Sequence, residues 1–160
     1  MFSPMDKAKL RAELLAVVEQ ALEAARGAYA AAIEGATHPE ARAENDKDTR
    51  GLEQSYLARG QAQRVAELEA GVANVAAMAL RRFGAGDPVA SGALVGVEEG
   101  GARTHYFVAP AGGGSVLAGD VQVITPVSPL GRALAGKRIG DEVELKIGGK
   151  ARELEIIDLA

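Results

Sequence analysis

The chain has 160 residues, of which 48% are hydrophobic and only 4% aromatic, and its formal net charge is −4 at pH 7. The hydrophobic content is sufficient for a folded core, whereas the negative charge argues against salt-driven attachment to nucleic acid, which requires a basic face. With no cysteine and two histidines, the sequence excludes disulfides, thiolate zinc sites, thiol catalysis and a histidine-rich metal cage.

The N-terminal segment, MFSPMDKAKLRAELL, carries charged residues ahead of its first apolar run. No stretch of the sequence approaches the roughly 20 apolar residues that a helix needs to span a bilayer. Together with the lack of cysteine, this leads us to expect a cytoplasmic protein that is neither exported nor bound to a membrane.

The first predicted element is a long helix over residues 7–33. Small or apolar residues recur there in alternating steps of four and three, which is the spacing of a helix face that packs against a partner along its whole length. The residues of this first row are Leu10, Leu14, Val17, Ala21, Ala24, Ala28 and Ala31. At 1.5 Å per residue, the helix would be about 40 Å long.

A second row of the same spacing predicts a second helix. Its residues are Ala58, Gln61, Val65, Leu68, Val72, Val75 and Ala79. Two such rows predict that residues 1–83 form an antiparallel coiled-coil hairpin, in which the many alanines let the two backbones approach closely.

The predicted tip of the hairpin, near residues 35–48, is densely charged. The stretch HPEARAENDKDTR, residues 38–50, has four carboxylates and three cations. Two turns fit the sequence, a tight one at residues 35–37 and a wider one that reaches Glu44. Thr37 and Glu40 also have the spacing of a capping box, so Glu40 has a structural alternative to a functional role. A solvated tip without function is the alternative for the whole stretch.

The helical period ends at Gly84, Gly86, Asp87 and Pro88, and residues 84–160 read as strands with one short helix. The helix begins with Ser128 as N-cap and Pro129 at its first position, and Gly136 ends it. The predicted strands cover residues 89–97, 104–109, 121–125, 142–147 and 152–157. The predicted fold class is therefore α+β, with the helical hairpin followed by a small antiparallel sheet.

Residues 124–159, ITPVSPLGRALAGKRIGDEVELKIGGKARELEIIDL, closely resemble the C-terminal signature of the bacterial Gre transcript cleavage factors. In that family a run of Ser-Pro-Leu/Ile-Gly/Ala-Arg-Ala-Leu-x-Gly-Lys precedes a Gly-Asp-Glu/Asp-Val strand. Residues 92–110 are similar in kind to the paired strands before the signature. In the hairpin, Glu44-Asn45, Glu53-Gln54, Gly60 and the AELE of residues 66–69 resemble the family's descending helix.

The resemblance implies an FKBP-like C-terminal domain that docks at the rim of the secondary channel of RNA polymerase, while the coiled coil reaches toward the active centre. The residues implied in docking are Ser128, Pro129, Leu130, Gly131 and Arg132, although Arg132 has an alternative role in capping carbonyls. The implied protein is a monomer that meets nucleic acid only within the elongation complex, and it is not itself an enzyme.

In this family, tip carboxylates help to hold a Mg²⁺ of the polymerase while the polymerase hydrolyses backtracked RNA. The resemblance therefore implies no cofactor and no metal in the free protein, but a Mg²⁺ shared with the polymerase through Glu44. The tip departs from the family's Gly-Asp-x-x-Glu-Asn, because Ala41 stands at the Asp position. The substitute carboxylates are Glu40, Asp46 and Asp48, so we expect an effect on elongation with weak or no RNA cleavage, the alternative being a full cleavage factor.

Two other classes of function are compatible with the same elements. A peptidyl-prolyl isomerase needs an aromatic-lined pocket, but alternation along a strand would place Tyr106 and Phe107 on opposite faces. A coiled-coil adaptor unrelated to transcription would not bind core RNA polymerase, so a binding measurement separates it from a Gre-like regulator.

Overall fold

The computed structural model describes residues 6–37 and 50–160, which form two compact units. The hairpin unit consists of the described residues between 18 and 72, and the sheet unit consists of residues 6–17 and 73–160. Two helices, α1 (Lys7–Thr37) and α2 (Arg50–Ala77), contribute residues to both units. Within the described residues, no helix is long and apolar enough to cross a membrane.

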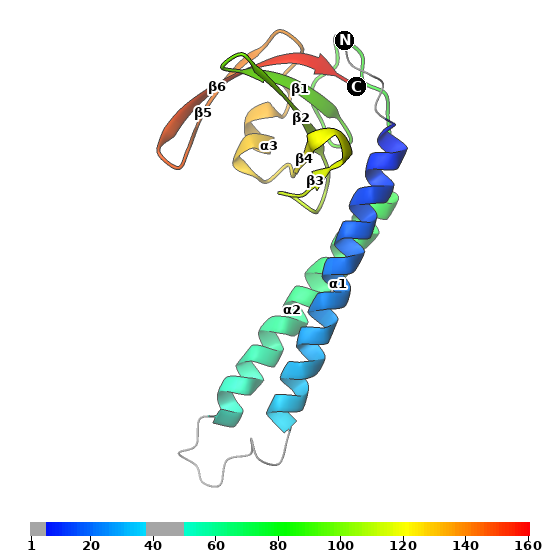
Figure 1. Ribbon diagram of the computed structural model, residues 1–160, viewed down its shortest axis with the longest axis vertical. Helices are drawn as coiled ribbons and strands as arrows, with labels where there is room; N and C mark the ends of the chain where they lie inside the picture. Colours follow the sequence, from blue (N-terminus) through cyan, green and yellow to red (C-terminus); the bar gives the residue numbers. More distant parts are fainter. Residues whose placement is uncertain (1–5, 38–49) are drawn as a thin grey trace. The chain divides into compact units, whose positions relative to one another are not determined.

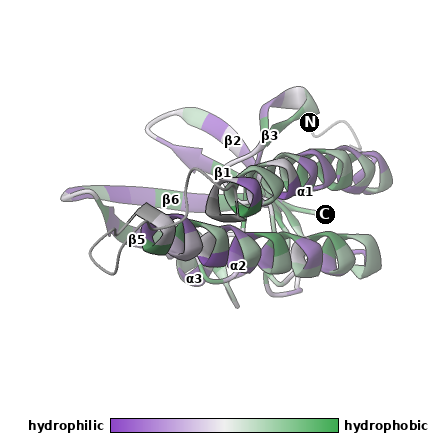
Figure 2. Cartoon of the chain, turned by 90° about the horizontal axis from the view of Figure 1, so that it is seen from below, coloured by the Kyte–Doolittle hydropathy of each residue, from purple (hydrophilic) through white to green (hydrophobic). Residues whose placement is uncertain are grey.

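In the hairpin unit, α1 and α2 lie side by side in both views (Figures 1 and 2). Figure 2 shows that hydrophilic and hydrophobic residues alternate around each helix, as expected for helices that bury one face. Arg26 joins the two helices through an ion pair with Glu69, with Nη2 and Oε1 3.4 Å apart, and it also contacts Glu23 of its own helix at 2.8 Å. The predicted pair of long helices is confirmed.

The packed face of α1 in this unit differs by one residue from the predicted row. Val18 is 3% exposed, whereas the predicted Val17 is 39% exposed. Leu22 and Ala25 are likewise buried in place of their predicted neighbours Ala21 and Ala24. The physical reason is that both rows are apolar, but the row with Val18 and Leu22 removes more apolar surface from water when it packs.

The row on α2 is closer to the prediction. Ala58, Leu68 and Val75 are buried as expected. However, α2 ends at Ala77, before the glycine and proline residues that were predicted to end it. In the segment that follows, Met78 and Phe83 are buried, at 8% and 7% exposure.

The sheet unit contains six strands in the order β3-β4-β2-β1-β6-β5 (Figure 1). The strands are β1 (Leu94–Glu99), β2 (Ala102–Val108), β3 (Val116–Leu117), β4 (Val121–Ile124), β5 (Glu142–Ile147) and β6 (Lys150–Leu159). All pairings are antiparallel except that of β2 with β4, which is parallel. The sheet is therefore mixed, because the chain forms a β3–β4 hairpin through the 3₁₀ turn η2 (Ala118–Asp120), and that hairpin brings β4 alongside β2 in the same direction.

One face of the sheet packs against the short helix α3 (Pro129–Leu134). Leu130 and Leu134 of α3 join a buried cluster with side chains from β1, β2, β4, β5 and β6. The predicted cap is confirmed, since the Ser128 hydroxyl accepts a hydrogen bond from the Gly131 amide at 3.0 Å. Gly136 has the positive φ of 77° that is expected of a residue that ends a helix.

Candidate functional site

A groove opens in the sheet unit beside the start of α3, with a volume of about 460 Å³. Its walls come from β2, β4, the glycine turn before β3, the N-terminus of α3 and the end of the β5–β6 hairpin. Pro129, Leu130 and Ile147 provide apolar surface, and hydroxyl groups come from Thr104, Tyr106, Thr125 and Ser128. The mixture of a broad apolar wall with a few polar groups is typical of a binding site.

The groove brings together three of the five residues predicted to dock. Ser128, Pro129 and Leu130 line it. Gly131 is buried behind them, and a Cβ at this position would lie 1.9 Å from the Thr125 carbonyl oxygen, so only glycine fits. Arg132 is exposed and is not among the lining residues. Gly131 thus shapes the wall, while the docking role of all five residues stays a prediction.

Arg152, which the sequence did not single out, is the charged side chain of the groove lining. It forms a two-pronged ion pair with Glu99, in which Nε lies 3.0 Å and Nη2 lies 2.8 Å from Oε2. Hydrogen bonds from the guanidinium to Glu99 and then to Tyr106 raise the pKa of Arg152 above its ordinary value. The three side chains come from β6, β1 and β2, so no local motif marks them.

Tyr106 and Phe107 lie on opposite faces of β2. Tyr106 belongs to the buried cluster on the α3 side and lines the groove, whereas Phe107 is fully buried outside that cluster. Among the described residues, Tyr106 is therefore the aromatic side chain of the groove lining. One aromatic ring does not make the aromatic-lined pocket that a prolyl isomerase needs.

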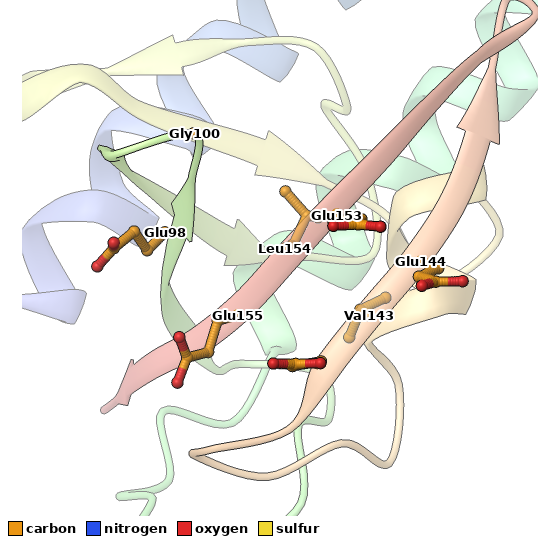
Figure 3. A pocket seen from close by; sticks show the side chains of 8 residues that line it. Glu98, Gly100, Val143, Glu144, Glu153, Leu154 and Glu155 are labelled. Atoms are coloured by element: carbon orange, nitrogen blue, oxygen red, sulfur yellow. The ribbon is translucent and has the colours of Figure 1, made fainter.

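The opposite side of β5 and β6 carries an acidic hollow of about 240 Å³ (Figure 3). Its carboxylates stand directly opposite one another, with Glu142 across from Glu155 and Glu144 across from Glu153. Such like-charged pairs cost a few tenths of a kcal/mol each. Within the described part of the chain, none of these four residues has an ion-pair partner, and no group of residues there could hold a metal ion.

The predicted tip carboxylates, Glu40, Glu44, Asp46 and Asp48, lie outside the described residues. Their roles, including the sharing of Mg²⁺ through Glu44, stay predictions.

Residues 85–160 match the family model of the C-terminal domain of the transcription elongation factors GreA/GreB. Transcription elongation factor GreA of Rhodospirillum rubrum is 37% identical over 73 residues, which cover 44% of this chain and 45% of that protein. GreA of Syntrophus aciditrophicus is 35% identical over 75 residues, covering 46% of this chain and 45% of that protein. The chain thus spans about half the length of the curated relatives it matches.

Solved structures of two Gre factor homologues are also similar. The GreA factor homolog 1 (Gfh1) protein of Thermus thermophilus has 23% identity and a TM-score of 0.40, with 91% of this chain and 94% of that chain covered. Gfh1 of Thermus aquaticus has 24% identity and a TM-score of 0.41, with 89% and 90% covered. The groove, α3 and the acidic hollow all lie within residues 85–160, the segment that matches the C-terminal domain of the transcription elongation factors GreA/GreB.

Proposed function

We propose that the protein regulates transcription elongation by binding RNA polymerase through the groove beside α3 and by inserting its helical hairpin into the secondary channel of the polymerase. The observation that carries this proposal is the position of the groove, which lies wholly within the segment that matches the GreA/GreB C-terminal domain. In this proposal the protein acts as a cytoplasmic monomer, meets nucleic acid only inside the elongation complex, and leaves the chemistry to the polymerase.

The rim of the groove has the exposed apolar side chains that a docking surface requires. Val127, which directly precedes the groove residue Ser128, is 71% exposed, and Ile147 of the groove lining is 37% exposed. Exposed apolar groups around a concave surface favour association with a partner that covers them. Because α3 is anchored by the Ser128 cap and the close contact at Gly131, this rim is held in place before a partner arrives.

Docking can be tested by the affinity of the full chain for core RNA polymerase. Val127→Glu places a charge on the rim and is expected to weaken binding by about tenfold or more. Val17→Glu is the control, since Val17 is an exposed valine of α1, a helix that contributes no residue to the groove lining. Equal binding by wild type and both variants would argue against the groove, and a wild type that does not bind core polymerase would favour an adaptor unrelated to transcription.

The tip is proposed to act through Glu44 first and through Glu40, Asp46 or Asp48 second, on a Mg²⁺ that the polymerase supplies. Carboxylates are ligands that suit Mg²⁺, but Ala41 stands where the family has its first tip acid. A displacement of about 1 Å can cost on the order of 100-fold in rate. We therefore infer a modulator of elongation with weak or absent stimulation of RNA cleavage.

The tip can be tested on a stalled elongation complex at saturating protein, with elongation and cleavage of the RNA 3′ end measured together. Glu44→Gln and Asp46→Asn should reduce the effect on elongation and leave polymerase binding unchanged, because they alter charge away from the docking groove. Strong cleavage by the wild type would instead establish a full cleavage factor. If both variants behave like wild type in both measurements, the tip carboxylates have no role in elongation or cleavage, and the tip is a solvated turn.

A further inference from the structure

The charge distribution of the groove is simple. Of the residues that line it, Arg152 is the one with a charged side chain, and the others are apolar, amide, hydroxyl or glycine residues. Glu99, which binds Arg152, is not among the lining residues. A partner that enters the groove therefore meets a single cation beside an apolar wall.

Arg152 is held in place and still accessible. Its guanidinium group is fixed by the hydrogen bonds from Nε and Nη2 to Glu99 at 2.8–3.2 Å, and its side chain is 29% exposed. A guanidinium has five N–H donors in a rigid plane, so the hydrogen bonds from Nε and Nη2 to Glu99 leave donors for a further acceptor. An oriented cation loses less freedom on binding than a mobile one.

The surroundings of Arg152 favour a protein partner over a nucleic acid. Glu144 and Glu153, the neighbours of Leu145 and Arg152 on β5 and β6, are exposed carboxylates on the opposite side of the same hairpin. A phosphate backbone binds where several cations neutralise it, whereas the groove lining offers the single cation Arg152. A carboxylate on a protein segment needs only one guanidinium, and its apolar neighbours can cover Pro129 and Ile147.

We propose that Arg152 is a specificity-determining contact of the groove, and that it binds a carboxylate of an Asp or Glu side chain on the polymerase segment that docks there. Glu99 is its positioning residue, because it orients the guanidinium and is not among the residues that line the groove. The proposal rests on the proposed docking of polymerase in this groove and adds the chemistry of the segment that it selects.

The test measures the affinity of the full chain for core RNA polymerase at two salt concentrations. Arg152→Gln is expected to weaken binding by about tenfold or more at low salt and to reduce the salt dependence, since one ion pair is lost. Arg152→Lys should recover only part of the affinity, because an ammonium lacks the planar fork. Arg103→Gln is the matched control, since it removes the same charge from an exposed residue of β2 outside the groove lining.

The outcomes separate this proposal from the proposed function. If Val127→Glu loses binding while Arg152→Gln binds like wild type, polymerase docks in the groove without the predicted carboxylate contact, and the proposal is wrong. Equal losses for Arg152→Gln and Arg103→Gln would indicate a general charge effect and would also overturn it. If wild type fails to bind polymerase, the proposed function itself fails.

Two further measurements close the remaining alternatives. A single-stranded RNA oligonucleotide is titrated into the free protein, and binding that depends on Arg152 would show a nucleic acid occupant and contradict the proposal. Circular dichroism checks that each variant is folded. If Arg152→Gln does not fold, Arg152→Lys retains the cation and still carries the test, with weaker binding than wild type expected and unchanged binding contradicting the proposal.

Discussion

The hairpin unit and the sheet unit bury different kinds of side chain. The large side chains with less than 2% exposure, including Phe107, Leu134 and Ile156, all belong to the sheet unit. The buried residues of the hairpin unit are smaller on average and include Ala25, Ala32 and Ala58. The core of the sheet unit is therefore packed from large side chains whose shapes must fit one another. The hairpin unit is packed instead through a row of small side chains along each helix.

This difference explains where the sequence keeps a recognisable pattern. In the sheet unit, Ser128 caps α3 and Gly131 fits against a carbonyl oxygen, so the residue types at these positions are dictated by contacts. In the hairpin unit, many small or apolar residues can occupy a helix face with little loss. Residues 85–160, which contain both Ser128 and Gly131, match the model of the GreA/GreB C-terminal domain.

The same substitution should have opposite effects in the two units. Gly131→Ala would place a Cβ 1.9 Å from the Thr125 carbonyl oxygen, and we expect it to lower the free energy of unfolding by about 3 kcal/mol or more. Gly27→Ala lies inside α1 with nothing within 4 Å of the new Cβ, and we expect it to stabilise by about 0.5–1 kcal/mol. Urea unfolding of both variants gives the two values. Equal effects would mean that the two units are not packed as differently as described.

A pair of neighbouring valines tests the packed face of the hairpin unit. Val18→Asp would bury a charge at a position that is 3% exposed, and we expect a loss of about 3 kcal/mol. Val17→Asp, at 39% exposure, should cost less than about 1 kcal/mol. Thermal unfolding followed by circular dichroism distinguishes the two variants. If Val17→Asp melts at a lower temperature than Val18→Asp, the packed face of α1 is the row predicted from the sequence.

Local patterns in the sequence were sufficient for much of the sheet unit. Strand β5 has the predicted bounds, and Gly100 and Gly101, between β1 and β2, have positive φ values of 56° and 82°. The N-cap of α3 was predicted because Ser-Pro at a helix start has a direct physical reason. These features depend on residues that are close in the chain, which is why a sequence pattern records them.

Features set by long-range contacts were missed. Strand β3 has only two residues, too few for a periodic signal, and its hairpin with β4 is what makes the β2–β4 pairing parallel. Arg152 of the groove and its partner Glu99 are separated by 53 positions and meet because β1 and β6 pair. The row on α1 was displaced because two adjacent rows were apolar, and only packing against a partner selects between them.

The smallest expected effect compares one cation from each unit. In the sheet unit, the Lys7 ammonium donates to the carbonyl oxygens of Arg81 at 2.6 Å and Gly92 at 2.8 Å, and it lies 4.9 Å from the centroid of the Phe83 ring. Burial, followed by the charge of Arg81, lowers the pKa of Lys7 below its ordinary value of 10.5. In the hairpin unit, Arg26 is exposed and pairs with Glu23 and Glu69 at the surface.

A lowered lysine pKa in the folded state means that the unfolded chain binds more protons between the folded and unfolded pKa values, so folding becomes more favourable as the pH rises through that window. We therefore expect the stability of wild type relative to Lys7→Met to increase between the lowered pKa and about 10.5. Relative to Arg26→Met it should stay constant over the same range, because arginine remains protonated throughout. Urea unfolding across alkaline pH measures both differences. A stability difference for Lys7→Met that falls with pH would show that the folded protein raises the pKa of this lysine, with the carbonyl and ring contacts outweighing the cost of burial.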